Sequence, residues 1–142
     1  MSFDFTNFQQ AYEAMSHFDR ENGLRNTVHA PGDVTVSMTV LEKHLSSPNV
    51  CHGGALAAMM DAVIGYAALT STIPDGNLVS TVEFKMNYLK PLYLGDELTG
   101  RGEVVRKGRT LVVSKGEIRR GEEIVGIGQG TFNVYSLDKR SF

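Results

Sequence analysis

The sequence lacks the features that mark several large classes of protein. It has one cysteine, Cys51, which excludes an intrachain disulfide and any zinc site built from several cysteines. It has no basic excess, because 14 Lys and Arg face 16 Asp and Glu for a net charge of −2. Binding to nucleic acid without regard to base sequence depends on such an excess. We therefore expect no metal, no cofactor and no nucleic-acid partner.

Signals for export or membrane insertion are also missing. The N-terminal residues 1–5 have no positive region and no unbroken apolar stretch, unlike a signal peptide. The most apolar segment, residues 53–69, is shorter than a membrane span and has Asp61 in its middle. A lone cysteine is compatible with a reducing compartment. The sequence predicts a cytoplasmic protein that does not contact a membrane.

What is present is the composition of an ordinary globular protein, with 42% hydrophobic and 21% charged residues. The length of 142 residues, without a repeat or a linker, favours a single domain over residues 1–142. The spacing of Phe8, Tyr12 and Met15 predicts an amphipathic helix at about residues 5–18.

A second, central helix is predicted at about residues 54–71. This run is rich in Ala, Leu and Met, which are good helix formers, and it is too long for a buried strand. It is apolar on all sides, so other elements must wrap around it.

The rest of the chain predicts strands. Residues 34–41 and 79–89 alternate between apolar and polar side chains with a period of two. We expect strands at about residues 24–29, 34–41, 79–89, 95–105, 110–118 and 123–135. Short glycine turns join the later ones, which predicts an antiparallel meander.

Three glycines of the last strand, Gly126, Gly128 and Gly130, share one face, which indicates close approach of the apolar helix. The predicted fold is α+β, with a long central helix wrapped by a curved antiparallel β-sheet.

Asp61 is the most informative residue for function, because it is the only charge in residues 53–69. Burying an unpaired carboxylate is costly. One interpretation is a structural carboxylate that pairs with Arg or Lys, or that points out at a seam. The other is a nucleophile or general base.

The motif His52-Gly53-Gly54 stands at the start of the central helix. A helix N-terminus offers unpaired N–H groups and a positive dipole end, and glycines let a substrate approach the backbone. The Gly53 or Gly54 N–H is therefore a candidate oxyanion donor. The alternative is that the glycines only permit a sharp turn into the helix.

These two features cannot act on one substrate from the same chain. Asp61 follows the glycines by seven to eight residues, which is about 11 Å along a helix axis. If both act together, they come from two chains whose helices run antiparallel, as in a two-fold homodimer.

Other motifs rank lower. Cys51 is more typical of a small buried hydrophobe than of a nucleophile. There is no G-x-S-x-G, H-E-x-x-H or phosphate-binding glycine loop. The cluster Arg106-Lys107-Gly108-Arg109 either binds phosphate groups or is a solvated turn.

Taken together, residues 34–135 resemble a hotdog-fold acyl-CoA thioesterase of the PaaI-like group, related to the 4-hydroxybenzoyl-CoA thioesterases. The resemblance rests on His52-Gly53-Gly54 with an acid, Asp61, nine residues after the histidine. It is strengthened by Tyr88-Leu89-Lys90-Pro91 at a strand end and by the turn at residues 106–110.

The resemblance implies hydrolysis of an acyl-CoA to the free acid and CoA. It assigns the Gly53 N–H to polarising the thioester carbonyl and His52 to positioning the thioester. Asp61 of the partner subunit then acts as nucleophile or as base for water, and Thr81 helps to place that water. The CoA path is implied to run past Tyr88 and the turn formed by Arg106, Lys107, Gly108, Arg109 and Thr110.

The resemblance also implies a homodimer, with dimers paired into tetramers. Gly54 and Asn49 are further candidates for substrate binding. Some relatives carry Asn or Gln six residues before the histidine, where this chain has Ser46, whereas Asn49 stands three residues before it. We expect Met59, Met60 and Val63 in the wall of the acyl pocket.

Two other functions compete with the thioesterase. One is another hotdog enzyme, a dehydratase or hydratase acting on acyl thioesters, although no matching His-carboxylate motif is found. The other is a non-catalytic acyl-CoA-binding module, which is usually attached to an output domain for which this chain has no spare length. The acyl group itself is not specified by the sequence.

Overall fold

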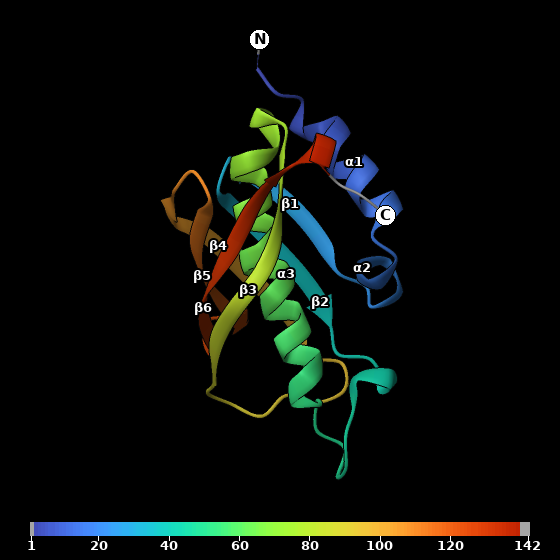
Figure 1. Ribbon diagram of the computed structural model, residues 1–142. Helices are drawn as coiled ribbons and strands as arrows, with labels where there is room; N and C mark the ends of the chain where they lie inside the picture. The colour runs from blue at the N-terminus through green and yellow to red at the C-terminus, as the bar shows by residue number, and fades with distance from the viewer. Residues whose placement is uncertain (1, 140–142) are drawn as a thin grey trace.

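One long helix lies in the hollow of a curved antiparallel sheet (Figure 1). The structure is a computed structural model that describes residues 2–139. The central helix, α3, spans Gly53–Thr72. The sheet consists of β1 (Arg25–Ala30), β2 (Asp33–Thr39), β3 (Asn77–Tyr88), β4 (Glu97–Lys107), β5 (Leu111–Arg120) and β6 (Glu123–Ser136). The predicted α+β architecture is confirmed. The observed central helix extends one residue beyond the predicted bounds at each end.

The strand order corrects the predicted meander in one respect. The sheet runs β1-β2-β4-β5-β6-β3, and all its pairs are antiparallel. The strands β4, β5 and β6 form the predicted meander, but β3 pairs with β6 instead of β4. The chain between β3 and β4 therefore crosses to another part of the sheet, and β3 is left at an edge.

Helix α3 is the core element. With its continuation through the 3₁₀ turn η2 (Ile73–Asp75), it is long and apolar enough to cross a bilayer, contrary to the expectation that the segment is too short. However, 61% of its most apolar window is buried inside the structure, as in the core helix of a soluble domain.

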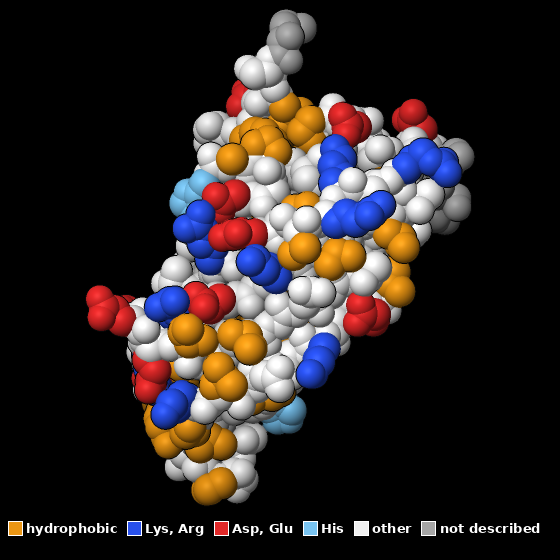
Figure 2. All heavy atoms as spheres, turned by 90° about the vertical axis from the view of Figure 1, so that its left-hand side faces the viewer, with side chains coloured by type: hydrophobic (Ala, Val, Ile, Leu, Met, Phe, Trp, Pro, Cys, Tyr) orange, Lys and Arg blue, Asp and Glu red, His pale blue; other side chains and the backbone are white. Residues whose placement is uncertain are grey.

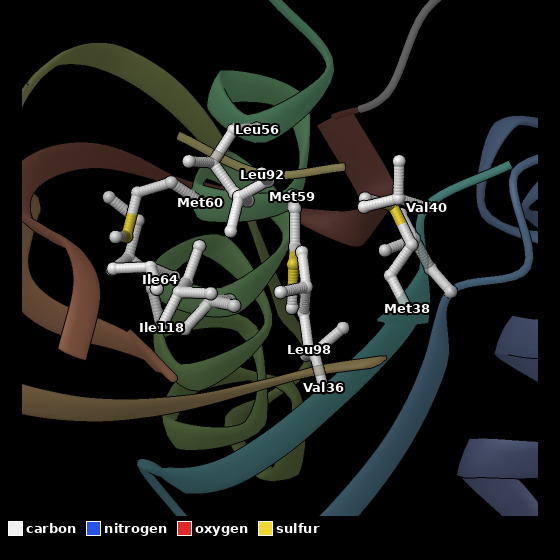
Figure 3. Close-up of a cluster of buried hydrophobic side chains, with 14 of the residues drawn as sticks. Val36, Met38, Val40, Leu56, Met59, Met60, Ile64, Leu92, Leu98 and Ile118 are labelled. Atoms are coloured by element: carbon white, nitrogen blue, oxygen red, sulfur yellow. The ribbon is translucent and has the colours of Figure 1, made fainter. Parts of the chain in front are cut away.

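The core forms between the sheet-facing side of α3 and the inner face of the sheet (Figure 3). Met59, Met60 and Ile64 from the helix are completely buried there. They pack against strand residues that include Val36, Leu98 and Ile118. Side chains spaced three and four residues apart share one helix face, so this stripe is fixed by the helical period.

Glycines let the sheet close on the helix, as predicted for the last strand. A Cβ on Gly128 would lie 3.0 Å from Met60 Cγ, and one on Gly130 would lie 3.0 Å from Ile64 Cδ1. The helix backbone comes nearest at Gly102 of β4, where a Cβ would meet the Val63 carbonyl oxygen at 2.3 Å. The closest approach is therefore made on β4, a strand for which the sequence raised no such expectation.

The N-terminal segment forms two helices where one was expected at residues 5–18. Helix α1 spans Phe5–Met15 and α2 spans His17–Glu21, because Ser16 has non-helical backbone angles. Arg20 stabilises the break by donating from its guanidinium to the Ala14 carbonyl at 2.8 Å. The expected apolar stripe ends early, since Met15 is 67% exposed.

Rings fix α1 against the central helix. Phe8 stacks on Tyr66 with ring centroids 6.2 Å apart, and Tyr12 lies against the same ring at 5.0 Å. We call α1 and α2 together the N-terminal arm. The remaining short elements are the 3₁₀ turns η1 (Glu42–His44) and η3 (Leu137–Lys139).

The outer face of the sheet carries acidic and basic side chains side by side (Figure 2). Exposed ion pairs such as Arg101–Asp33, at 2.9 Å, join neighbouring strands. This mixture agrees with the net charge of −2 and leaves no single-signed field on the face that is drawn.

Candidate active site

Asp61 lies on the side of α3 that the sheet leaves partly uncovered. Its side chain is half-buried, so the expectation of a deeply buried carboxylate needs correction. The Thr81 hydroxyl on β3 donates a hydrogen bond to Asp61 Oδ1 over 2.8 Å. The structure thus brings together two residues that the sequence placed at the site, and both belong to one chain.

A cavity of about 520 Å³ opens beside this pair. Its walls come from the N-terminal arm, from α3 and from β3, and include Tyr12, Asp19, Asp61, Tyr66 and Thr81. The expectation that Met59, Met60 and Val63 line the pocket is wrong, since all three are fully buried against the sheet. They lie on the opposite side of the helix from the cavity. The helix residues that line the cavity next to Asp61 include Ala58, Ala62 and Gly65.

His52 is the N-cap of α3. Its ring Nδ1 accepts a hydrogen bond from the Gly54 N–H at 2.8 Å. In the neutral ring the proton therefore sits on Nε2, which leaves Nε2–H free to donate. The same bond occupies the Gly54 N–H, so this group no longer qualifies as an oxyanion donor. The Gly53 N–H has no partner within the described residues 2–139.

Tyr88 holds the backbone of the same turn. Its hydroxyl, from the end of β3, donates to the Gly53 carbonyl over 2.8 Å. Tyr88 and Gly53 also line a second cavity of about 310 Å³ together with Cys51 and Lys90. The sequence placed Tyr88 on the CoA path, and the structure puts it beside the predicted oxyanion donor.

Asp61 and Gly53 are not brought together within one chain. They are eight residues apart on a continuous helix, which is about 12 Å along its axis. This agrees with the sequence argument that a joint site requires two chains.

The basic turn at residues 106–110 lies at the other end of α3 from Gly53. Lys107 Nζ donates to the Ser71 carbonyl at 2.6 Å and pairs with Asp75 at 2.7 Å. Ser71 is 18 residues from Gly53, or about 27 Å along the helix. The Lys107 ammonium is therefore already engaged, whereas Arg106 and Arg109 are exposed.

The other two residues of that turn, Gly108 and Thr110, form backbone hydrogen bonds that hold the hairpin. Gly108 donates its N–H to the Leu111 carbonyl at 2.8 Å, where a Cβ would lie only 2.8 Å from the same oxygen. The Thr110 carbonyl accepts from the Val134 N–H on β6. Within one chain this turn does not meet Tyr88.

Asn49 stands at the exposed tip of the loop before α3. Its φ is +63°, a left-handed conformation that asparagine tolerates better than most residues, and its N–H bonds to the Ser46 carbonyl. Within a single chain, Asn49 therefore shapes a turn and does not face Asp61.

Sequence reasoning missed His44, which anchors this loop. His44 is buried, its Nδ1 accepts the Leu41 N–H at 3.0 Å, and its Nε2 faces Asn22 Oδ1 at 3.0 Å. Burial and the nearby Lys43 charge lower the pKa of its imidazole. Its carbonyl accepts the His52 N–H at 2.7 Å, so it links the arm to the predicted oxyanion turn.

Cys51 fits the predicted role of a small hydrophobe. It packs against the core, and burial raises the pKa of its thiol, so the thiolate form is disfavoured. Among residues 2–139, no cluster of His, Cys, Asp and Glu has the geometry to hold a metal ion.

Polar groups also gather beneath the N-terminal arm, where no sequence pattern indicated them. Asp19 and Tyr66 line the cavity beside Asp61, and Asn26 of β1 is buried nearby. Burial raises the pKa of Tyr12 to about 12, with a contribution from the Asp19 charge. Burial likewise raises the pKa of Asp19.

Known proteins are similar to this chain in sequence and fold. The thioesterase superfamily model matches residues 48–127. Human acyl-coenzyme A thioesterase 13 is 30% identical over 96 residues, which is 67% of each chain. The chain spans about two thirds of the length of this and other curated relatives.

Solved structures agree. The conserved protein PA5202 of Pseudomonas aeruginosa superposes with a TM-score of 0.79 at 30% identity, over 85% of this chain and 95% of that one. The PaaI protein of Escherichia coli, from the phenylacetic acid degradation operon, has a TM-score of 0.83 at 24% identity, over 93% of each chain, and shows the shared hotdog fold. The family match covers more than half of the chain and includes Gly53, Asp61, Thr81 and Tyr88. The chain therefore belongs to the thioesterase superfamily and is a thioester hydrolase of the PaaI-like, hotdog-fold type.

Proposed function

We propose that the protein hydrolyses an acyl-CoA to the free acid and CoA. The observation that carries the proposal is the Asp61 carboxylate, held by the Thr81 hydroxyl at 2.8 Å on the wall of a cavity of about 520 Å³. A carboxylate so placed can attack a carbonyl or activate water. The relationship to human acyl-coenzyme A thioesterase 13 supports CoA as the thiol.

The proposed site is shared between two subunits. Among the residues that the structure describes, β3 pairs only with β6, so it is an edge strand, and its Val82 is 58% exposed. Unpaired strand edges are templates for pairing with another chain. Antiparallel pairing of two β3 edges about a two-fold axis extends the sheet and sets the two α3 helices antiparallel. That arrangement places Gly53 of one subunit opposite Asp61 of the other.

In this shared site, the free Gly53 N–H donates to the thioester carbonyl oxygen. The helix dipole adds to this, because charge develops on that oxygen in the transition state. The His52 Nε2–H, fixed by the bond from the Gly54 N–H, is the second donor toward the thioester. Tyr88 holds the turn in place through the Gly53 carbonyl.

Two routes for the bond changes are compatible with this geometry. In one, Asp61 attacks the carbonyl carbon, the C–S bond breaks to release CoA thiolate, and water then hydrolyses the anhydride. In the other, Asp61 takes a proton from water, whose oxygen attacks the carbonyl carbon; the C–S bond then breaks, and the leaving CoA thiolate takes up the proton from Asp61. In both, the products are the acid and CoA, and Thr81 holds Asp61 in position.

The CoA part of the substrate is proposed to leave the site past Tyr88 and to reach the basic turn of a neighbouring subunit. Arg106 and Arg109 are the residues of that turn suited to bind phosphate, because Lys107 is engaged with Asp75. Gly54 and Asn49 contribute through the shape of the turn before the helix. Pairing of dimers into tetramers is part of the same proposal.

The test is thiol release from a panel of acyl-CoAs by the wild type and by Asp61→Asn. We expect the variant to fold and to bind acyl-CoA, with kcat at least about 100-fold lower. Asp33→Asn is the matched control, because Asp33 forms an exposed ion pair on the outer sheet, and its kcat should be unchanged.

Two results would replace this proposal. Binding of acyl-CoA by the wild type without turnover would favour a non-catalytic binding module. Hydration of an enoyl thioester that survives Asp61→Asn would favour another hotdog acyl-thioester enzyme.

A further inference from the structure

Strand β3, which lies beside β6 at the edge of the sheet (Figure 1), contains a β-bulge at Val82. Thr81 stands opposite Phe132 of β6 and Glu83 stands opposite Thr131, so Val82 between them is an extra residue. Such a bulge bends the strand and increases its local twist. Val82 is 58% exposed, so burial of its side chain does not account for the bulge.

The bulge brings the two site residues of β3 to the same face of the sheet. Side chains alternate between the faces of a regular strand, so Thr81 and Tyr88, seven residues apart, belong on opposite faces. In the structure both reach α3, because Thr81 donates to the Asp61 carboxylate and Tyr88 donates to the Gly53 carbonyl. Each of them holds one half of the proposed site.

The strand changes face at Val82. Thr81 stands opposite Phe132, which is buried in the core, and directly opposed residues share a face of the sheet. On the other side of the bulge, Phe84 and Met86 pack against the same core. The extra residue therefore joins an odd-numbered and an even-numbered set of inward side chains, which the regular alternation of the sequence did not indicate.

We propose that Val82 is a positioning residue for the reaction and that it acts through the backbone; this inference rests on the proposed function. As the extra residue of the bulge, it turns the Thr81 hydroxyl toward the side of α3 on which Asp61 lies half-buried. Bulges next to active sites re-aim single side chains in this way, and they are frequent at sheet edges. The remainder of β3 keeps the regular pleat that directs Tyr88 to Gly53.

Deletion of Val82 should change the aim of Thr81 and leave the pairing on both sides as it is. Without the extra residue, Thr81 can still stand opposite Phe132, and Glu83 can still stand opposite Thr131. Thr81 therefore stays on the inner face, and the bend that directs its hydroxyl is lost.

The test measures kcat and KM for thiol release from an acyl-CoA that the wild type hydrolyses. We expect deletion of Val82 to lower kcat at least about tenfold with little change in KM, because the hydrogen bond to the reacting carboxylate is lost. Val82→Thr, which keeps the extra residue, should hold kcat within about twofold of the wild type. If the deletion variant does not fold in a thermal unfolding assay, Val82→Gly replaces it. This change loosens the bulge backbone and should lower kcat about threefold.

A double-mutant comparison separates positioning from a general effect on the strand. If the bulge acts through Thr81, Thr81→Val should lower kcat about tenfold in the wild type but less than about twofold when Val82 is also absent. A bulge that only stabilises β3 would give independent effects, which multiply to about a hundredfold.

Strand β4 supplies a matched control. Val105 is likewise an extra residue, in the pairing of β4 with β5, and it is 54% exposed. Its deletion should leave kcat unchanged for the matching acyl-pantetheine, which lacks the phosphate groups proposed to reach the neighbouring basic turn.

Three results would overturn this inference alone. They are a wild-type kcat after deletion of Val82, multiplication of the two effects in the double mutant, and an equal loss of kcat after deletion of Val105. Absence of hydrolysis by the wild type on every acyl-CoA would instead overturn the proposed function, and this inference with it.

Discussion

At the scale of single residues, the bond between Thr81 and Asp61 determines how the carboxylate is presented. Thr81 donates its hydroxyl proton to Oδ1 over 2.8 Å. Within the described residues Oδ2 has no protein partner, so it is the oxygen available for reaction. Thr81 therefore positions the carboxylate and leaves its charge in place. An ion pair with Arg or Lys would instead neutralise that charge.

Replacing Thr81 by Val removes the hydroxyl and keeps the shape of the side chain. We expect kcat to fall about tenfold with little change in KM, because a hydrogen bond to a charged group is lost. Thr81→Ser should recover most of kcat. Steady-state kinetics of the three proteins checks this, and equal kcat in wild type and Thr81→Val would show that the bond has no part in turnover.

The residues of the site that sequence could predict are those tied to a local motif. His52, Gly53 and Asp61 stand on one helix, so their spacing alone indicated their positions along it. Asp19 and His44 were not predictable in this way, because their roles arise where separate elements meet. No spacing within residues 16–26 distinguishes a buried acid of the arm from an exposed one.

At the scale of elements, periodicity predicted the strands and the central helix within a few residues. It did not predict that β3 pairs with β6. This pairing depends on the route of the long connection between β3 and β4, and the alternation of apolar residues within a strand carries no information about that route. Nor did it predict the break at Ser16. A helical apolar spacing continued to Met15, but the guanidinium of Arg20 satisfies a carbonyl at the end of α1 and lets the chain turn.

The loop before α3 is an element whose stability should depend on pH through His44. Burial lowers the pKa of His44 from its usual 6.5, and its Nδ1 accepts the Leu41 N–H. As the pH falls below 6.5, the unfolded chain binds a proton that the folded chain refuses. Stability from this group is therefore complete above pH 6.5 and declines as the pH falls through the lowered folded pKa.

Urea unfolding from about pH 7.5 to about pH 5 measures this decline. His44→Gln should flatten it, whereas His29→Gln, which changes an exposed histidine on β1, should leave it in place. An equal pH dependence in wild type and His44→Gln would show that the decline has another source.

At the scale of the whole molecule, the helix that forms the core also separates the two halves of the proposed site. The eight residues between Gly53 and Asp61 span about 12 Å, and no side-chain rearrangement removes a helical distance. A dimer with antiparallel helices joins the halves and creates two sites, each with one group from either subunit.

Complementation between two inactive variants tests this sharing. Asp61→Asn removes the carboxylate. Gly53→Pro removes only the oxyanion N–H, because proline is accepted at the first helical position and His52 already has the extended angles, φ −61° and ψ 133°, that precede proline. The space at Gly53 also permits a side chain, since the nearest atom to an added Cβ is 3.6 Å away.

Each variant alone should be nearly inactive. After equal amounts are mixed by refolding, half of the dimers should be mixed, and each mixed dimer has one site with both Asp61 and the Gly53 N–H. We therefore expect about a quarter of the wild-type activity per subunit. Thiol release before and after refolding measures the recovery. Mixtures that stay as inactive as the separate variants, although sedimentation shows mixed dimers, would mean that the carboxylate and the oxyanion donor do not come from different subunits.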